Sequence, residues 1–360
     1  MAEPIADRVM GSELASGSFE RQQSRFRDWV GVDPRAGAGV DATSVYGVAA
    51  GRYHLYVSLA CPWCHRAAIL RELAGLQDAV GISYVAPFRD ERGWAFTGER
   101  FTDGPGGEYV DRLHGWELMA EAYRISDPSF EGRITVPVLW DTETRRIVSN
   151  ESSEIIRMFY APESLGGLGA AVEERTAREA SAGGAAAFAG AELGGGGLDL
   201  YPPALREQID ALNARIYDTV NNGVYRAGFA RRQDAYERAF AELFESLEWL
   251  EDLLAHRRYL AGAQITEADW RLFPTLVRFD EVYHVHFRCN RRRIVEYPNL
   301  WGYTRELYQW PEVAKTVAME QIKRHYYTTH DELNPKRIIP VGPAPQWLAP
   351  HGRGSLHSLA

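Results

Sequence analysis

The sequence predicts an α/β domain followed by a helical domain, and two observations of hydrophobic periodicity support this. Between residues 53 and 159, short aromatic and β-branched runs alternate with segments whose apolar residues recur at helical spacing. From Tyr201 onward the apolar residues follow the helical period. The length of 360 residues suits about two domains of ~100–200 residues each. We therefore expect an N-terminal arm at residues 1–50, the α/β domain at 51–165, a Gly/Ala-rich linker at 166–200, the helical domain at 201–330 and an irregular tail at 331–360.

In the α/β domain, strands are expected at residues 53–58, 80–88, 134–140 and 147–148, and helices at residues 66–76 and 149–159. The motif Cys61-Pro62-Trp63-Cys64 stands between the first strand and the first helix. Pro137 lies inside the third expected strand. Because proline cannot donate to a ladder, it marks an edge, a bulge or a cis turn there.

In the helical domain, helices are expected at residues 205–217, 234–254, 266–282, 300–308 and 311–324. Thr266 and Asp269 have the spacing of a capping box, with Asp in place of the usual Glu, and the helix they open is expected to continue through Pro274. The polar arm is expected to lie over the body, anchored by its apolar residues Phe19, Phe26 and Trp29.

Composition excludes several classes of protein. Apolar residues make up 45% and charged residues 25%, which rules out a chain disordered throughout, a collagen-like repeat and a coiled coil. The 40 basic and 49 acidic side chains give a net charge of −9, whereas nucleic-acid binding needs a basic surface, so no nucleic acid is expected as a partner. The sequence has no run of ~20 apolar residues, so no membrane span is predicted. Residues 1–10 lack the apolar core of a secretory signal. No membrane partner is therefore expected.

The three cysteines, Cys61, Cys64 and Cys289, are too few for a disulfide scaffold, which predicts a reducing compartment, the cytoplasm. Pro62 suits the first position of a helix, so Cys61 is expected at the N-cap. There the free backbone N–H groups and the helix dipole stabilise a thiolate, which lowers a cysteine pKa to ~3.5–7.5 from ~8.5. Cys61 is therefore a candidate nucleophile, whereas Cys64 lies one turn further in and is more shielded.

The cysteine pair also admits purely structural roles. A structural zinc site needs four ligands, and the group of His284, His286 and Cys289 matches no standard spacing, so no metal is expected. Two inert, buried cysteines are the remaining alternative.

Two further features suit a thiol-containing ligand. A proline in an apolar strand, downstream of a strand–Cys-x-x-Cys–helix unit, is typical of a thioredoxin-type fold, in which the backbone before a cis proline pairs with an extended thiol peptide. Glu151 and Ser152 open the next helix, whose N-terminus is an anion site, and the Glu151 carboxylate can accept from an α-amino group. The pair suits an amino acid zwitterion such as the γ-glutamyl end of glutathione, and an ordinary capping pair is the alternative.

Five segments together resemble the glutathionyl-hydroquinone reductases, the xi class of glutathione transferases: residues 53–63, 132–140, 148–158, 221–230 and 277–290. The resemblance covers about residues 15–345, apart from the Gly/Ala-rich stretch. It implies a thioredoxin-like N-terminal domain, an all-helical glutathione-transferase C-terminal domain and a homodimer. The implied reaction reduces S-glutathionyl-hydroquinones to hydroquinones with glutathione as co-substrate, without a metal or a nicotinamide.

The resemblance also implies roles for individual residues. Cys61 is the nucleophile, Tyr225 matches a proton donor or acceptor, and Tyr283 and Tyr326 match tyrosines that face the cysteine and lower its pKa. The residues implied to hold glutathione are Trp94, Arg133, Ile134, Thr135, Val136, Glu151 and Ser152. Without the resemblance, core packing is the default interpretation of each tyrosine. Cys64 departs from the family, because many members have Ala there.

That second thiol leaves other functions open. A glutaredoxin-like dithiol oxidoreductase would use both Cys61 and Cys64. A non-catalytic transferase-like binding module would have an ordinary cysteine pKa. The joining of glutathione to electrophiles is disfavoured, because a cysteine at this position would be trapped as a mixed disulfide.

Overall fold

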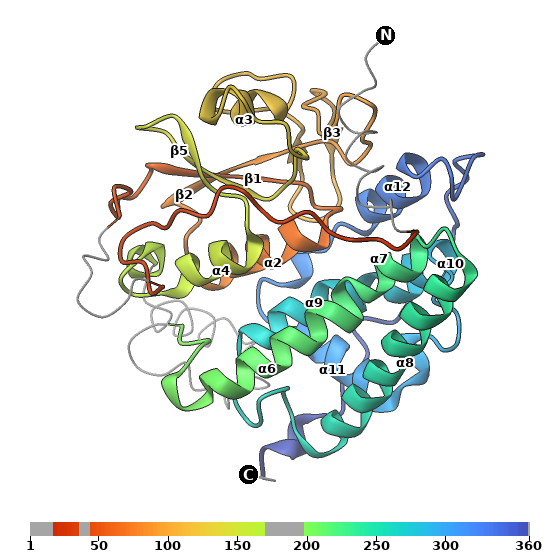
Figure 1. Cartoon of the computed structure of the whole chain (residues 1–360). Coiled ribbons are helices and arrows are strands. Elements are labelled where there is room, and N and C mark those ends of the chain that lie inside the picture. Colours follow the sequence, from red (N-terminus) through yellow and green to blue (C-terminus); the bar gives the residue numbers. More distant parts are fainter. Residues whose placement is uncertain (1–16, 36–43, 170–197, 359–360) are drawn as a thin grey trace. The chain divides into compact units, whose positions relative to one another are not determined.

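The computed structural model describes residues 17–35, 44–169 and 198–358, which fall into two compact units (Figure 1). The first, here called the α/β unit, consists of Gln23–Asp199 and Lys315–Ala318. The second, the helical unit, consists of Met1–Gln22, Leu200–Ala314 and Met319–Ala360. Most of the predicted Gly/Ala-rich linker, residues 170–197, lies outside the described residues.

The α/β unit is built on a four-stranded mixed sheet in the order β2–β1–β5–β6. The strands are β1 Tyr53–Val57, β2 Val80–Tyr84, β5 Val138–Asp141 and β6 Arg146–Ser149. β1 and β2 are parallel, whereas β5 is antiparallel to both β1 and β6. All five residues of β1 are buried, as expected of a strand covered on both faces.

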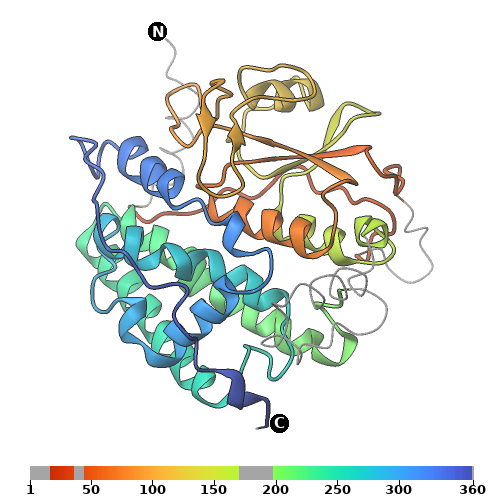
Figure 2. The same cartoon turned by 180° about the vertical axis from the view of Figure 1, so that it is seen from behind.

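Helices cover both faces of this sheet. α2 (Pro62–Leu73) packs beside α4 (Ser152–Tyr160) on one face, and α3 (Ala120–Ser126) lies on the other (Figures 1 and 2). A two-stranded ribbon, β3 (Arg100–Phe101) with β4 (Gly107–Glu108), belongs to the same unit. This is the thioredoxin-like arrangement that the sequence predicts.

The elements of the α/β unit differ from the sequence prediction mainly in their ends. α2 begins at Pro62 and ends at Leu73, because Gly75 takes a left-handed φ of 68° that stops the helix earlier than the apolar spacing indicates. The strand expected within residues 80–88 ends at Tyr84, and β5 begins only after Pro137. Neither α3 nor the β3–β4 ribbon was predicted.

The described part of the helical unit consists mainly of six helices and two π-helical turns. They are α6 Arg206–Ile216, the π-helical turn η4 Tyr217–Asn221, α7 Gly223–Gly228, α8 Gln233–His256, α9 Glu267–Arg278, the π-helical turn η5 Phe279–Tyr283, α11 Pro298–Tyr308 and α12 Met319–Thr329. α6 packs on α9, and α8 packs on α7 and α11 (Figure 1). A three-residue segment, α10 His284–His286, follows η5.

Two features of α9 confirm the sequence analysis. Thr266 and Asp269 form the predicted capping box, with the Thr266 N–H donating to Asp269 Oδ2 at 2.8 Å. The helix also continues past Pro274, and η5 extends it to Tyr283. The Arg278 guanidinium donates to the Pro274 carbonyl at 2.9 Å, which satisfies that oxygen inside the core.

The predicted helix at residues 311–324 is wrong in its first half and correct from residue 319 onward. Residues Ala314–Thr316 form only a 3₁₀ turn, and α12 starts at Met319. Glu312 has a φ of 69°, a left-handed conformation that no α-helix accommodates, so no helix starts at Pro311, and the non-helical residues 317 and 318 separate the 3₁₀ turn from α12. The short helix α7 was missed because glycines stand at both of its ends.

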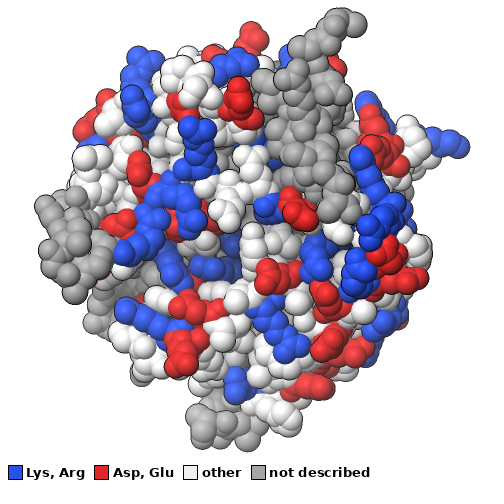
Figure 3. Space-filling view, viewed as in Figure 1, with Lys and Arg blue, Asp and Glu red and all other residues white. Residues whose placement is uncertain are grey.

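Surface charge contributes little to this fold. Basic and acidic side chains are interspersed over the face shown in Figure 3. Pairs such as Arg232–Asp234 and Arg238–Asp234 are about half exposed, and water and salt screen the attraction in such pairs, so they stabilise the fold little. Among the described helices, none is long and apolar enough to cross a membrane.

A buried histidine in β1 predicts an acid-sensitive fold. His54 is 5% exposed, its Nε2 lies 2.8 Å from Ser83 Oγ, and burial lowers its pKa to about 4. Since an unfolded histidine titrates near ~6.5, the unfolded state binds more protons between these values and stability falls as the pH falls. We expect this group alone to cost about 2 kcal/mol between pH 7 and pH 5 in urea unfolding.

The matching variants isolate this effect. Between pH 7 and pH 5, the free energy of unfolding of His54→Gln should fall by about 2 kcal/mol less than that of the unmodified chain. His256→Gln, at an exposed position of α8, should keep the full dependence. Equal pH dependence in all three proteins would contradict the assignment to His54.

Candidate active site

Cys61 lies at the N-cap of α2, where the sequence places it. Its backbone is extended, with φ −77° and ψ 125°, and its carbonyl accepts from the His65 N–H at 3.0 Å. Pro62 occupies the first turn. The sulfur makes no side-chain capping hydrogen bond, and the thiol instead donates to the Val136 carbonyl at 3.7 Å. The thiol therefore lies beside the backbone segment that precedes Pro137.

The three cysteines differ in environment. All are free thiols, but Cys61 is 8% exposed whereas Cys64 and Cys289 are fully buried. Cys64 Sγ accepts from the Ser58 N–H at 3.4 Å, and the Cys289 thiol donates to the Phe287 carbonyl at 3.7 Å. Burial raises the pKa of the Cys289 thiol. Of the three cysteines, only Cys61 has solvent-accessible surface through which it could react.

The segment beside Cys61 is fixed by a hydrogen-bond network. The Val136–Pro137 bond is cis, one of the alternatives that the sequence left open. The Tyr123 hydroxyl lies 2.8 Å from the Thr135 carbonyl and 3.2 Å from its N–H, and Asn150 Nδ2 donates to both the Tyr123 hydroxyl and Thr135 Oγ1 at 3.1 Å. Burial raises the pKa of Tyr123, so its hydroxyl stays protonated. The network holds residues 134–136 in place next to the thiol.

Glu151 and Ser152 lie at the start of α4. Glu151 is the N-cap, and its Oε1 accepts from the Ser153 N–H at 3.0 Å and from Ser153 Oγ at 2.7 Å. Burial raises the pKa of Glu151, but hydrogen bonds from Ser153 and Ser24 and the charge of Arg66 together hold it below its usual value. Glu151 is thus an ionised capping residue, and capping leaves room for a ligand because a carboxylate has about four acceptor positions.

Trp94 and Arg133, the two other residues implied to hold glutathione, belong to the same unit. Trp94 is 5% exposed, and its ring lies 5.7 Å from the Arg89 guanidinium. Arg133 is half-buried and comes directly before Ile134 and Thr135. The α/β unit therefore contains every residue implied to bind glutathione, and their roles stay predictions.

In the helical unit, the three tyrosines singled out from the sequence meet. Tyr225 comes from α7, Tyr283 from η5 and Tyr326 from α12. The Tyr326 hydroxyl lies 2.5 Å from that of Tyr225 and 2.9 Å from that of Tyr283. The ring of Phe287 packs against all three, at 5.4–5.6 Å between centroids. We call this group the tyrosine cluster.

Protonation of the tyrosine cluster follows from its burial. Tyr283 and Tyr326 are almost fully buried, and burial, reinforced by the neighbouring tyrosines, raises the pKa of each well above the usual value. The charge of the buried Arg278 acts in the opposite direction and is outweighed. Both hydroxyls are therefore neutral hydrogen-bond donors at physiological pH.

The candidate metal ligands do not assemble. His286 Nε2 lies 3.0 Å from His330 Nδ1, and Cys289 is turned to a backbone carbonyl. Among the residues that the structure describes, no group of three or more His, Cys, Asp or Glu side chains is arranged to hold a metal ion.

Known proteins are similar to this chain in sequence and in fold. Residues 60–161 match the family described as glutathione S-transferase, N-terminal domain, and residues 233–306 match its C-terminal domain. Glutathionyl-hydroquinone reductase YqjG of Escherichia coli is 46% identical over 96% of this chain and 95% of its own length. Glutathionyl-hydroquinone reductase PcpF of Sphingobium chlorophenolicum is 43% identical over 94% of each chain. The chain belongs to the glutathionyl-hydroquinone reductase family.

Solved structures of the same family agree. The glutathione-bound structure of YqjG has a TM-score of 0.78, with 92% of this chain and 96% of that chain covered at 45% identity. The glutathione transferase Xi of Phanerochaete chrysosporium has a TM-score of 0.79 at 43% identity, with 93% and 96% covered. The predicted fold of the glutathionyl-hydroquinone reductases, a thioredoxin-like domain with an all-helical glutathione-transferase domain, is thereby confirmed.

Sequence reasoning missed the supports of the site. Tyr123 and Asn150 hold the segment at residues 134–136, and the ring of Tyr225 is covered by the Arg21 guanidinium at 5.0 Å. The position of Asn150, directly before Glu151, was the one available signal. Arg21 lies more than 200 residues from Tyr225 in sequence, and no local pattern indicates the contact.

Proposed function

We propose that this chain catalyses the glutathione-dependent reduction of S-glutathionyl-hydroquinones to hydroquinones. The observation that carries the proposal is the position of Cys61, at the N-cap of α2 with its sulfur 3.7 Å from the Val136 carbonyl. The positive end of a helix dipole stabilises a thiolate there. YqjG and PcpF, both named as glutathionyl-hydroquinone reductases, support the choice of substrate.

The proposed reaction has two steps. The Cys61 thiolate attacks the sulfur of the glutathionyl group, the S–S bond forms, and the bond between sulfur and the ring carbon breaks. The electron pair left on the ring carbon takes a proton, which Tyr225 supplies, and the hydroquinone leaves. A second glutathione, as thiolate, then attacks the Cys61–glutathione disulfide and releases oxidised glutathione and the Cys61 thiolate.

The electron balance closes within this scheme. Two glutathionyl sulfurs are oxidised to one disulfide while one ring carbon–sulfur bond is reduced to carbon–hydrogen. Glutathione is the only reductant required, so we propose neither a metal nor a nicotinamide.

Binding of glutathione is assigned to the α/β unit. Glu151 accepts from the γ-glutamyl ammonium, and Ser152 with the N-terminus of α4 binds the γ-glutamyl carboxylate. The Val136 backbone pairs with the cysteinyl unit, next to Ile134 and Thr135. Trp94 and Arg133 bind the glycyl end.

Three broader statements complete the proposal. The resemblance of the sequence to the xi class implies a homodimer and a role in quinone metabolism. The three free cysteines favour a reducing compartment, and we place the protein in the cytoplasm.

The direct test is product analysis. The protein, a synthetic glutathionyl-hydroquinone and glutathione should yield hydroquinone and oxidised glutathione in equal amounts. Absence of turnover, with the thiol of Cys61 titrating near ~8.5 in alkylation against pH, would instead favour a non-catalytic binding module.

A further inference from the structure

Residues 24–28 of the N-terminal arm run along the junction of β6 and α4 within the α/β unit. The Asp28 N–H donates to the Val148 carbonyl at 2.9 Å, and the Asn150 N–H donates to the Phe26 carbonyl at 3.0 Å. Arg27 and Ser149 form an antiparallel bridge. These contacts extend the sheet edge and bring the arm to the residue directly before Glu151.

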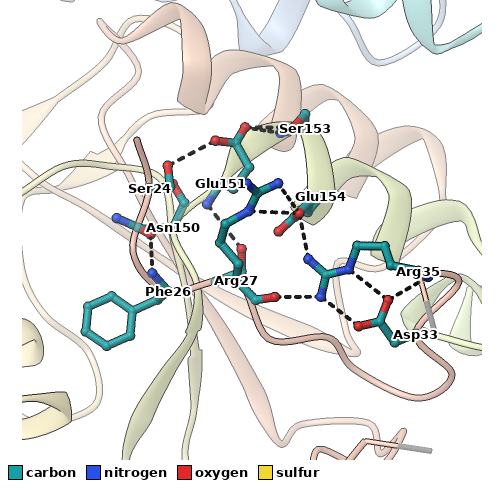
Figure 4. A network of polar contacts seen from close by, with 10 residues as sticks. Ser24, Phe26, Arg27, Asp33, Arg35, Asn150, Glu151, Ser153 and Glu154 are labelled. Carbon is teal, nitrogen blue, oxygen red and sulfur yellow. Dashed lines mark hydrogen bonds and ion pairs between the residues drawn. The ribbon is translucent and has the colours of Figure 1, made fainter. Parts of the chain in front are cut away.

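At the end of this pairing, Ser24 contacts Glu151 itself (Figure 4). Ser24 Oγ lies 3.0 Å from Glu151 Oε2 and 3.2 Å from the Asn150 carbonyl. The other carboxylate oxygen, Oε1, is occupied by the N–H and hydroxyl of Ser153. The carboxylate is therefore held from both sides, once by its own helix and once by the arm.

Ion pairs fix the arm at this place. Glu154 follows Ser153 in the sequence. Its Oε1 pairs with the guanidinium groups of both Arg27 and Arg35, at 2.5 and 2.8 Å (Figure 4). Glu154 is 6% exposed, and Arg35 also pairs with Asp33 at 2.7 Å. A carboxylate shared by two guanidinium groups forms a network of charge-assisted hydrogen bonds, which holds geometry better than an isolated surface pair.

We propose that Ser24 is a positioning residue in the glutathione site. Its hydroxyl orients the Glu151 carboxylate toward the γ-glutamyl ammonium of glutathione. This rests on the proposed function. The terminal torsion of a glutamate is broad, so a carboxylate held only at Oε1, by Ser153, can still turn about that contact and move Oε2. With Ser24 in place, both oxygens are fixed, and the remaining acceptor position points in one direction.

The test measures binding separately from turnover. S-methylglutathione keeps the γ-glutamyl group but has no free thiol, so its Kd by titration calorimetry reports this site without reaction at Cys61. Ser24→Ala should raise that Kd, and the KM for glutathione, about threefold to tenfold while kcat stays the same. Ser24→Thr keeps the hydroxyl and should bind within about twofold of the unmodified chain.

Two controls separate positioning from general damage. Ser44→Ala removes a hydroxyl that accepts from the Tyr46 N–H in the same arm, and it should leave the Kd unchanged. In a Glu151→Gln background, Ser24→Ala should have much less effect, because its partner is altered. A Kd for Ser24→Ala equal to that of Ser44→Ala overturns the proposal, as does an undiminished effect in the Glu151→Gln background.

Failure of the proposed function has a different signature. If the unmodified protein does not bind S-methylglutathione at all, the assignment of the glutathione site itself is wrong. If it binds S-methylglutathione but does not turn over the glutathionyl-hydroquinone, the reaction is wrong while the role of Ser24 is still measured by the Kd.

Discussion

Replacing Cys61 by alanine should lower turnover of a glutathionyl-hydroquinone by more than about 10³-fold, because it removes the nucleophile of the first step. Binding of S-methylglutathione should change little, since the contacts of Glu151 with Ser153 and Ser24 do not involve the thiol. The measurement is kcat with purified substrate, alongside the Kd. Retention of a tenth of the rate would refute the scheme.

Cys64→Ser is the matched control. If Cys61 is the only reacting cysteine, Cys64→Ser should change kcat by less than about threefold. The serine hydroxyl can replace Cys64 Sγ as acceptor for the Ser58 N–H. In a dithiol scheme, Cys64 would resolve the mixed disulfide, and its loss would block turnover. The complete burial of Cys64 favours the first outcome. A loss comparable to that of Cys61→Ala would establish the dithiol alternative.

The local part of this site could be predicted from the sequence. A strand, a cysteine and a proline opening a helix are consecutive, so the position of Cys61 at the N-cap follows from neighbouring residues alone. The Thr266 capping box is local in the same sense. Glu312 shows the limit, because its left-handed backbone prevents a helix from starting where the apolar spacing indicates one.

The non-local part could not be predicted in this way. Ser24 and Glu151 are 127 positions apart, and nothing near Ser24 marks it as a partner of a glutathione-binding carboxylate. Tyr225, Tyr283 and Tyr326 were singled out only through resemblance to the family, and their hydroxyl contacts span 101 and 43 positions. The resemblance to the family identified these residues. The hydrogen bonds between them could be found only in the three-dimensional structure.

Tyr225→Phe should lower kcat on the order of 10²-fold, because it removes the proposed proton donor to the ring carbon. The hydroxyl of Tyr225 is hydrogen-bonded to that of Tyr326, which in turn contacts Tyr283. Burial raises the pKa of Tyr283 and of Tyr326, so both stay protonated, and the proton that Tyr225 gives up is replaced by the one that the second glutathione releases when it ionises. The measurement is kcat at saturating substrate, with the midpoint of Cys61 alkylation against pH as the second readout.

The two readouts assign the role. If Tyr225 protonates the ring carbon, Tyr225→Phe lowers kcat and leaves the alkylation midpoint of Cys61 unchanged. Tyr327→Phe is the matched control on α12, since its hydroxyl donates to the Glu281 carbonyl outside the tyrosine cluster, and its kcat should be unaltered. A Tyr225→Phe variant as active as Tyr327→Phe rules out the proton transfer. A midpoint that moves up to ~8.5 shows instead that Tyr225 stabilises the thiolate, and the proton must then come from solvent or from another group.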